Sequence, residues 1–357
     1  MKVLLLEPGA SWSTADVSTG LEHGLKHHGV DVIKYRLDTR IARSANWLHY
    51  NWRKAKKANP AKEKPTIADV FYQAGSESIL TALRHQVDVV LIVSAMYVHP
   101  DLIVLMKRAG LRVVVLFTES PYDLDQEMAI AKLVDGCWTC ERSSVAAFGE
   151  VTRAGYLPHA WYSERHQAGA QDGDEAVRAH DVVFVGSGFQ ERIEWLKAID
   201  WTGIDFGLYG SWELLGSRHP LRRHVAGQIT DNATAAALYR RAKIGLNLYR
   251  TSKGFGKAAP RITHAESLNP RAYELARCGA FTLSTHRAEV SEVFGDLVPT
   301  FETPAEASAL IRRWLADDAG RAAIQSQLPA RVVESSWVER ATHVIGDIQS
   351  LLLERAA

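Results

Sequence analysis

Two short runs of apolar residues constrain the fold of this chain more than any other feature. Val87–Ser94 and Arg112–Thr118 are rich in valine and almost continuously apolar, rather than alternating in polarity. Such runs are typical of strands buried on both faces of a parallel sheet. The segment Pro100–Ala109 between them has the length of a helix, which is the connection that parallel strands need. An open, helix-covered parallel sheet is therefore predicted.

The alternation of strand and helix signals continues along the chain. Further strands are expected at Lys2–Glu7, Asp31–Leu37, Gly136–Cys140 and Tyr156–Pro158, then at Asp181–Gly186, Ile204–Tyr209, Lys243–Leu248 and Ala280–Ser284. With 357 residues, at about 100–200 residues per domain, the chain is long enough for two domains. The expected fold class is α/β, with two Rossmann-like domains facing each other across a cleft.

The boundaries of these domains follow from a polar stretch in the middle of the chain. Residues 1–165 are expected to form an N-terminal domain, 166–180 a linker and 181–335 a C-terminal domain. Residues 336–357 have helical spacing of apolar side chains and are expected to cross back to the first domain. In such sheets a ligand binds beyond the carboxyl ends of the strands.

Composition excludes several classes of protein. The 42 Lys and Arg residues nearly balance the 41 Asp and Glu residues, and the net charge of +1 excludes a globally basic nucleic-acid coat, although not a local patch. Three cysteines cannot build a disulfide framework, so a reducing cytoplasm is the expected location. The longest nearly apolar run, Val87–Val98, is too short to span a bilayer, so no transmembrane segment is expected.

The segment 266–281 carries the most chemical information. Asn269 is a good N-cap, and Pro270 suits the first helical position because its missing N–H is not needed there. The free N–H groups of the first turn, the helix dipole and Arg271 would together bind a diphosphate. Glu274, about one turn further on, would accept hydrogen bonds from ribose hydroxyls. The alternative is a capped amphipathic helix without a ligand.

Two other strand ends carry candidate binding residues. Gly186 permits close approach of the backbone, Ser187 can donate to a phosphate, and Arg192 follows one helical turn later. A tight turn with a surface arginine is the simpler alternative. Asn247 and Tyr249 share a face of their strand and would line a base or sugar pocket, unless Asn247 is an ordinary buried amide with satisfied hydrogen bonds.

The spacing of two glutamates leads to a family resemblance. Seven residues separate Glu266 from Glu274, which resembles the paired-glutamate signature of retaining glycosyltransferases with two Rossmann-like domains, the GT-B architecture. A longer set of strings is similar to the CgeB-type glycosyltransferases, a family named after a spore-maturation protein. These strings are FVGSGFQERIEWL at 184–196, LYGSW at 208–212, IGLNLYR at 244–250, SLNPRAYELARCGAF at 267–281 and FGD at 294–296. The resemblance covers roughly residues 181–345.

The resemblance implies a specific activity. A nucleotide-sugar donor, expected to be UDP- or GDP-linked, would be held by the C-terminal domain and an acceptor by the N-terminal domain. Retention of the anomeric configuration, no obligatory metal or other cofactor, and a catalytic or sugar-binding role for Glu266 are also implied. By analogy, Gly9 and Ser13 in the first strand–helix loop would face the donor. Lys257, in the basic loop 250–266, would close over its phosphates, unless that loop is simply mobile and solvated.

Two residues after buried strands are candidates for acceptor chemistry. His99 and Glu119 would reach the cleft, and Glu119 is the preferred acid or base, because removing a hydroxyl proton needs a carboxylate or histidine within hydrogen-bond reach. Capping of the following helix is the alternative. No metal site is predicted: Asp123-Leu-Asp125 lies at a helix start, where acids favour the dipole, and Cys137 and Cys140 form a lone CxxC pair on an apolar strand.

The segment from Arg40 to Pro65 stands apart because it is basic and aromatic. Candidate acceptor-binding residues are Arg43, Trp47, Trp52, Arg53, Lys54, Lys56 and Lys57. Basic groups attract phosphates and aromatic rings stack on bases or sugars, so a polyanionic acceptor is expected. DNA with a hydroxymethylated base is one candidate, and an anionic wall polysaccharide or a lipid-linked acceptor is another. A solvated basic helix or a membrane-surface anchor remains open.

The sequence thus predicts a hexosyl- or pentosyltransferase that moves a sugar from a nucleotide-sugar donor to a hydroxyl acceptor. Two other classes of function stay open. A nucleotide-sugar epimerase would keep the donor site but would need no basic acceptor segment. A non-catalytic protein that binds nucleotides or nucleic acid would bind without turnover. No oligomeric state is indicated.

Overall fold

The computed structural model describes residues 1–9, 14–227, 231–253 and 260–354, and the chain divides into two compact units. Unit 1 comprises Met1–Pro158 and Val338–Ala357, and unit 2 comprises His159–Trp337. Each unit has its own parallel sheet and its own apolar core. The two sheets agree with the predicted α/β class.

Unit 1 is built on a six-stranded parallel sheet with the order β2-β1-β3-β4-β5-β6. Its strands are β1 (Lys2–Glu7), β2 (Asp31–Arg36), β3 (Val89–Val93), β4 (Val113–Phe117), β5 (Gly136–Thr139) and β6 (Arg153–Tyr156). Every residue of β3 and β4 is buried, and Val90 pairs with Val113. Helices cover both faces of the central strands, which is why their sequences are continuously apolar.

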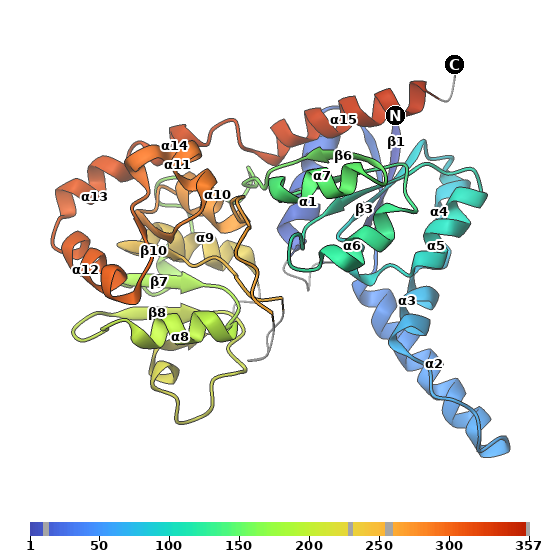
Figure 1. Ribbon diagram of the computed structural model, residues 1–357, viewed down its shortest axis with the longest axis horizontal. Coiled ribbons are helices and arrows are strands. Elements are labelled where there is room, and N and C mark those ends of the chain that lie inside the picture. Colours follow the sequence, from blue (N-terminus) through green and yellow to red (C-terminus); the bar gives the residue numbers. More distant parts are fainter. Residues whose placement is uncertain (10–13, 228–230, 254–259, 355–357) are drawn as a thin grey trace. The chain divides into compact units, whose positions relative to one another are not determined.

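The helices of unit 1 follow the strands in alternation. They are α1 (Ala15–His27), α2 (Asp38–Ala58), α3 (Ile67–Gly75), α4 (Glu77–His85), η1 (Ala95–Tyr97), α5 (Pro100–Arg108), α6 (Leu124–Ala131), η2 (Arg142–Ser144), α7 (Val145–Gly149) and the last helix, α15 (Trp337–Leu353). Helix α15 is labelled in Figure 1, and its Asp347 contacts unit 1 through Trp138, whose Nε1 donates to Asp347 at 2.7 Å. Arg153 and Glu354 form an ion pair at 3.0 Å.

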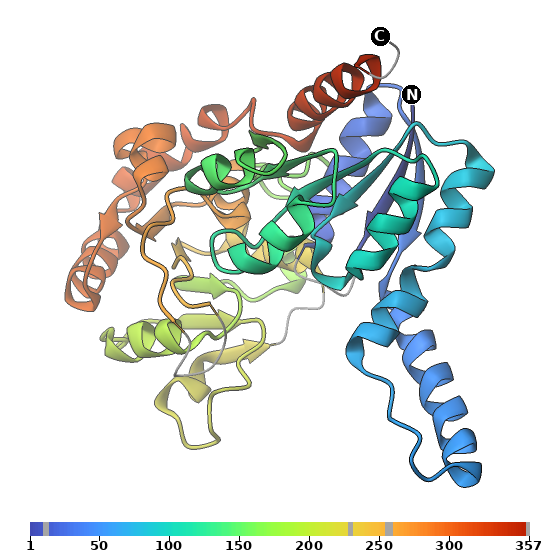
Figure 2. The same cartoon turned by 45° about the vertical axis from the view of Figure 1, so that its right-hand side comes forward.

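Helix α2 differs from the other helices of unit 1. Figures 1 and 2 show from two directions that it extends away from the sheet of its unit. Of its 21 residues only Ser44 is buried. A helix in a globular domain usually buries an apolar stripe, so this exposure requires an explanation outside the core.

Unit 2 is built on a second six-stranded parallel sheet, with the order β12-β11-β10-β7-β8-β9. Its strands are β7 (Val182–Val185), β8 (Phe206–Tyr209), β9 (Val225–Gly227), β10 (Ile244–Asn247), β11 (Thr282–Thr285) and β12 (Thr300–Phe301). Its core contains fully buried Phe184, Leu246 and Leu283, and the rings of Trp201 and Phe206 stack at 3.8 Å between centroids.

The helices of unit 2 are η3 (Asp174–Ala176), α8 (Gln190–Ala198), η4 (Pro220–His224), α9 (Asn232–Arg241), α10 (Pro270–Arg277), α11 (Ala288–Phe294), η5 (Gly295–Leu297), α12 (Pro304–Leu315), α13 (Asp318–Gln325) and α14 (Leu328–Arg331). Two helices of unit 2, α9 and α12, begin at a side-chain N-cap. Asp231 accepts from the Thr234 N–H at 2.8 Å, and Thr303 accepts from the Glu306 N–H at 3.2 Å. Both caps satisfy first-turn donors.

The polar stretch 166–180 belongs to unit 2. Asp174 and Arg240 form a buried ion pair with two hydrogen bonds of 2.6 and 2.7 Å. This pair attaches the stretch to α9, the helix that follows β9. Among the residues described, no helix combines the length and apolarity that crossing a membrane requires.

Candidate functional site

The candidate donor residues gather at one edge of the sheet of unit 2. Strands β7 and β10 are parallel neighbours, with Ile244 paired to Val182. Their carboxyl ends therefore meet at the same edge, where Gly186 follows β7 and Asn247 ends β10. Helix α10 begins beside them, because Asn269 donates from Nδ2 to Asn247 Oδ1 at 2.9 Å. This is the position at which open parallel sheets bind ligands.

A buried amide organises this edge. Asn247 is 1% exposed, and its Oδ1 accepts hydrogen bonds from Asn269 and, at 3.2 Å, from Arg271 Nη1. Asn247 Nδ2 donates to Ser284 Oγ at 3.4 Å. Asn269 in turn accepts from the Ala272 N–H at 3.1 Å and so caps α10. Three residues that the sequence singled out separately thus form one hydrogen-bonded group.

The guanidinium of Arg271 lies directly over the backbone of Gly186. A Cβ added at residue 186 would overlap Arg271 Nη2, so a side chain there would displace the guanidinium. The guanidinium also lies over the Phe184 ring, 4.7 Å from its centroid. Among the described residues, Arg271 has no carboxylate within 4.0 Å, so its charge is not paired inside the protein. Together with the first turn of α10, this cation makes the edge attractive to an anion.

Arg192 braces the loop after β7. It is 6% exposed, its Nε donates to the carbonyl of Leu248 at 3.1 Å, and its Nη1 donates to the carbonyl of Ser187 at 3.0 Å. Both bonds tie the loop to the end of β10. Arg192 therefore holds the Gly186–Ser187 turn in place. Whether its charge also contacts a diphosphate stays a prediction.

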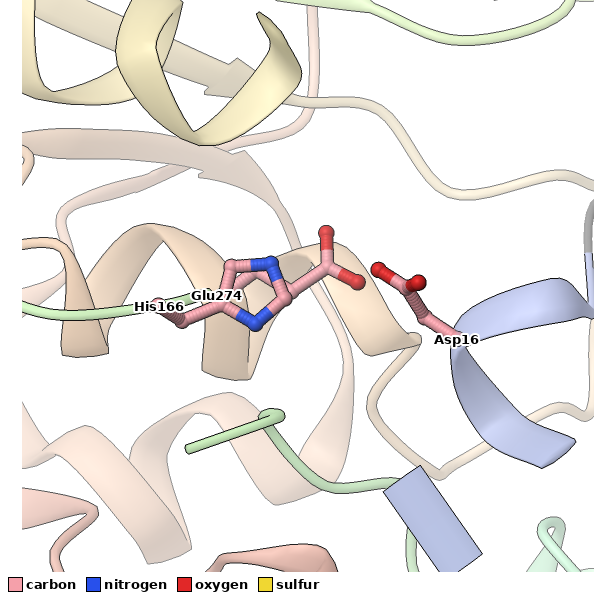
Figure 3. A group of neighbouring side chains, drawn as sticks. All are labelled: Asp16, His166 and Glu274. Carbon is pink, nitrogen blue, oxygen red and sulfur yellow. The ribbon is translucent and has the colours of Figure 1, made fainter. Parts of the chain in front are cut away.

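Glu274 has a histidine neighbour that the sequence analysis missed. Figure 3 shows the imidazole of His166 beside the carboxylate of Glu274, and a ring nitrogen and a carboxylate oxygen lie within 4.8 Å of each other. His166 is 1% exposed and accepts at Nδ1 from the Tyr162 N–H at 3.1 Å. Burial, reinforced by the charges of Arg165 and Arg240, lowers the pKa of His166 to about 3. Its ring is therefore neutral, with the proton on Nε2.

A cavity of about 390 Å³ lies in unit 1 at the carboxyl ends of β3 and β4. Both acceptor-side candidates line it: His99 at the start of α5, and Glu119 just after β4. The remaining lining residues are Ile67, Ala68, Phe71, Ser94, Ala95, Met96, Val98, Pro100, Asp123, Gln126, Glu127, Ala129 and Ile130. The volume is within the range of small-molecule sites.

His99 also has a structural role. It is the N-cap of α5, where its Nδ1 accepts from the Asp101 N–H at 3.2 Å. The ring packs edge-on against Tyr72, 5.3 Å between centroids. Because Nδ1 accepts this bond, the N–H of the ring is placed on Nε2. The capping alternative therefore holds for His99, and the same ring lines the cavity.

Glu127 is a second carboxyl group in this cavity that sequence reasoning missed. It accepts from the Glu119 N–H at 3.0 Å and from the Ser120 hydroxyl. Burial raises the pKa of Glu127 to about 8, and the charges of Glu119 and Asp123 act in the same direction against the two hydrogen bonds. The sequence did contain a signal that Glu127 is buried. Ile130 and Ala131 follow it by three and four residues, so all three lie on one face of α6, and that face is buried.

Comparison with known proteins supports the expected family. Residues 191–346 match the family model described as glycosyl transferase-like. The chain is 24% identical to the spore protein CgeB of Bacillus subtilis strain 168 over 219 residues, which span 58% of this chain and 67% of CgeB. This confirms the resemblance that the sequence strings indicated. In both comparisons the chain is similar to CgeB-like glycosyltransferases.

Solved structures agree on the fold of this glycosyltransferase. The trehalose-6-phosphate synthase OtsA superimposes with a TM-score of 0.63 at 11% identity, covering 98% of this chain and 99% of OtsA. An E. coli trehalose-6-phosphate structure with bound UDP-2-fluoro glucose gives 0.61 at 10% identity, with coverage of 98% and 99%. SnogD, a glycosyltransferase from Streptomyces nogalater, gives 0.51 at 16% identity, with coverage of 97% and 98%. The glycosyltransferase therefore has the two-domain GT-B fold.

The other predicted donor residues of the glycosyltransferase have separate surroundings. Tyr249 is buried beneath the guanidinium of Arg287, 4.1 Å away, and lines a cavity of about 270 Å³ at the ends of β10, β11 and β12. Glu266 is half-buried, and its carbonyl accepts from the Glu289 N–H at 3.3 Å. Burial raises the pKa of the Tyr249 hydroxyl. Tyr249 thus remains neutral.

Three predicted residues fall in or beside parts of the glycosyltransferase that the structure leaves undescribed. Ser13 and Lys257 lie outside the described residues. Gly9 is described: it has a φ of +104°, and a Cβ there would overlap the Asp38 carboxyl group. Gly9 is therefore required by the turn after β1. Its predicted donor contact stays a prediction.

The basic segment of the glycosyltransferase coincides with α2. Trp47 and Tyr50 are 58% and 68% exposed. The other exposed members of the predicted acceptor set are Arg43, Arg53, Lys54, Lys56 and Lys57. Trp52 is different, because its Nε1 donates to the Lys62 carbonyl at 3.0 Å and its ring stacks on His49. Trp52 therefore holds the segment after α2 against the helix.

Proposed function

We propose that this glycosyltransferase moves a hexosyl or pentosyl group from a UDP- or GDP-sugar to a hydroxyl group, with retention and without an obligatory metal. The observation that carries the donor part is the Arg271 guanidinium, held by Asn247 over Gly186 at the start of α10. A cation next to free helical N–H groups suits a diphosphate. The bound UDP-2-fluoro glucose in the E. coli structural relative supports a nucleotide-sugar donor.

Each residue of this site has a role in the proposal. Arg271 stabilises the negative charge that develops on the leaving diphosphate as the glycosidic bond breaks. Arg192 positions the Gly186–Ser187 turn through its two carbonyl contacts. Glu274 accepts hydrogen bonds from the ribose hydroxyls, beside the neutral ring of His166.

The acceptor part of the proposal rests on unit 1. Glu119 takes the proton of the acceptor hydroxyl, and His99, whose Nε2 carries a proton, donates a hydrogen bond to the acceptor. Glu266 in unit 2 is proposed to contact the transferred sugar. Retention rests on the similarity to paired-glutamate enzymes rather than on a measured distance.

Donor binding is the first test. We would measure thermal shifts and calorimetric affinities for UDP, GDP, ADP and dTDP, with and without magnesium, in the wild type and in Arg271→Gln. One nucleotide should stabilise the wild type without magnesium, and Arg271→Gln should bind it at least tenfold more weakly. Arg312→Gln is the matched control, because Arg312 is exposed and pairs with Asp200 on the surface. Failure of every nucleotide to bind would refute the donor site.

A turnover assay then distinguishes a transferase from an epimerase and from a non-catalytic binding protein. With the matching nucleotide sugar, a transferase releases the nucleoside diphosphate and needs an acceptor for a fast reaction. An epimerase would convert the sugar or the donor without an acceptor, and a non-catalytic protein would leave the donor intact. Either of these two results would replace the transferase proposal.

We also propose a polyanionic acceptor, on the basis of α2. Five exposed basic side chains of this helix form no ion pair with a carboxylate among the described residues, and Trp47 and Tyr50 project beside them. Unpaired cations and exposed rings suit phosphates and bases. DNA with hydroxymethylated bases is the favoured polymer.

The polyanion proposal has a charge-matched test. Lys54→Glu/Lys56→Glu/Lys57→Glu should weaken binding of hydroxymethylated DNA by at least tenfold and flatten its dependence on salt. Lys132→Glu/Lys197→Glu/Arg313→Glu changes the net charge equally on exposed residues elsewhere and should bind nearly as the wild type does. Equal losses in both variants would reject α2 as the binding element. Binding of an anionic wall polymer or lipid in place of DNA would reassign the acceptor.

A further inference from the structure

The cavity of unit 1 has an unusual combination of lining residues. Nine of its lining residues are apolar: Ile67, Ala68, Phe71, Ala95, Met96, Val98, Pro100, Ala129 and Ile130. They come from α3, from the segment after β3 and from α6. Apolar walls favour the ring or hydrocarbon part of a ligand, because burying that surface removes it from water.

The polar lining of the cavity is acidic. Glu119, Asp123 and Glu127 are among the lining residues, and the described lining contains neither lysine nor arginine. His99 uses its Nδ1 to cap α5. A phosphate or carboxylate entering this cavity would lose its hydration beside carboxyl groups and meet no lysine or arginine of the described lining. The cavity therefore discriminates against anionic groups, in contrast to α2.

Hydrogen-bonding groups are nevertheless placed for a hydroxyl. Glu119 follows β4, His99 begins α5, and both line the cavity together with Glu127, which accepts from the Glu119 N–H and the Ser120 hydroxyl. Burial keeps Glu127 protonated near neutral pH, so it adds a donor rather than another negative charge. A hydroxyl can donate to one of these groups and accept from another.

The backbone at this place is also unusual. Ser94, at the carboxyl end of β3, has a φ of +52°, which is uncommon for a residue with a side chain. It is 4% exposed, and its N–H donates to the Leu116 carbonyl at 2.9 Å, which holds the chain in this conformation. Such backbone conformations concentrate at functional sites. The bend turns η1 and the His99 segment toward the cavity wall.

We propose that this cavity binds an uncharged, hydroxyl-bearing ring compound. Rings face the apolar wall formed by α3 and α6, and the hydroxyl lies among His99, Glu119 and Glu127. That this compound is the group that receives the sugar rests on the proposed function. The binding itself does not, because every residue used belongs to unit 1.

The proposal is compatible with the basic helix. Helix α3, which supplies Ile67, Ala68 and Phe71, packs against α2. A polymer whose phosphates lie along α2 could therefore present an uncharged ring to the cavity, and a free small molecule could enter it without α2. The same ring chemistry serves both sources.

The test uses three probes that share one ring system: 2-naphthylmethanol, 2-naphthoic acid and 2-naphthylmethyl phosphate. Affinities would be measured by ligand-observed NMR on the full chain. We expect the alcohol to bind at least tenfold more tightly than the carboxylate or the phosphate. Ala68→Trp, which fills the cavity from an exposed helical position, should reduce alcohol binding at least tenfold.

Matched variants keep the result interpretable. Gln73→Trp is the control, because Gln73 is also exposed on α3 but does not line the cavity. Ala129→Trp fills the cavity from α6 and serves if Ala68→Trp disturbs folding, as judged by its melting curve. The proposal is overturned if the anions bind as well as the alcohol, or if the alcohol binds both filled variants as it binds the wild type.

Nucleotide affinity in the same samples separates this inference from the proposed function. Intact nucleotide binding with no alcohol binding would remove only the cavity proposal. Alcohol binding without nucleotide binding would support the cavity proposal and refute the proposed donor site. Displacement of the alcohol by hydroxymethylated DNA, but not by unmodified DNA, would assign the ring to a polymer. Absence of displacement would assign the ring to a free small molecule. Both results are consistent with the proposal that the cavity binds an uncharged ring alcohol.

Discussion

At the scale of single residues, Gly186 and Asn247 determine where the positive charge of the candidate donor site lies. Gly186 matters because its missing side chain leaves room for the Arg271 guanidinium. Asn247 matters because one oxygen accepts from both Asn269 and Arg271. The charge at the edge of the sheet is therefore placed by two neutral residues.

The first prediction concerns Gly186→Ala. The new methyl group would overlap Arg271 Nη2, and the guanidinium must move away from Asn247. We expect nucleotide affinity to fall about tenfold or more, while the melting temperature changes little because the displaced atom is the end of a flexible side chain. Calorimetry checks the affinity. Gly216→Ala, where a Cβ meets no atom within 4 Å, should keep the wild-type affinity.

The second prediction concerns Glu127 and pH. Its pKa is about 8 in the folded chain and about 4.5 when exposed, so the native state binds the proton between these values and the unfolded state does not. Stability should therefore fall as pH rises from about 4.5 to about 8, then level off. The loss is on the order of a few kcal/mol, at about 1.4 kcal/mol per pKa unit.

Glu127→Gln isolates this effect. The variant keeps an oxygen that can accept from Ser120 and Glu119 but has no proton to release. Urea denaturation at a series of pH values should show the wild type losing stability relative to Glu127→Gln across that window. Parallel curves for the two proteins would show that burial does not hold Glu127 protonated.

At the scale of elements, α10 and α2 represent opposite uses of a helix. Helix α10 has eight residues, buries Tyr273 and Leu275, and presents its N-terminus at the strand edge. Helix α2 has 21 residues and buries only Ser44. The N-cap and the buried side chains of α10 fix its position, whereas most side chains of α2 are exposed and available for binding.

The cap of α10 leads to a third prediction. Asn269→Ala removes the bond to the Ala272 N–H and the bond to Asn247, and it should cost about 1 kcal/mol or somewhat more in stability. Nucleotide affinity should fall with it, because Arg271 loses its fixed partner. Thr303→Ala, which removes the N-cap of α12, should cost similar stability without changing affinity. Equal affinity in both variants would contradict the site.

At the scale of the whole molecule, each unit has its own sheet, core and candidate cavity. The strand edge of unit 2 is cationic through Arg271, while the cavity of unit 1 is apolar and acidic. This division of properties within one chain agrees with an anionic donor diphosphate at unit 2 and an uncharged acceptor ring at unit 1.

The fourth prediction follows from this division. Hydrogen exchange in the presence of the matching nucleotide should slow at residues 186–192 and in the first turn of α10, within unit 2. The uncharged ring alcohol should instead slow exchange in α3 and in residues 94–99 of unit 1. Nucleotide protection confined to unit 1 would contradict the assignment of the units.

Much of the fold was determined by the sequence alone. The apolar runs around Val90 and Val115 can be buried only between two helical layers, and period and length identify such strands without tertiary information. A local signal also identified Asn269 as a helix cap. The strings at 184–196 and 267–281 indicated the CgeB-type resemblance because each is a pattern within one segment.

The tertiary structure decided which of these residues meet. His166 lies in a polar stretch that looked like a linker, and only its burial beside Glu274 gives it a place in the site. Glu127 did not stand out in the sequence, and it joins the cavity because α6 packs it against Glu119 and Ser120. Arg192 was predicted to be a phosphate ligand, yet it donates to the backbone carbonyls of Leu248 and Ser187. Sequence patterns report local periodicity and capping, whereas burial and charge pairing depend on residues that are distant along the chain.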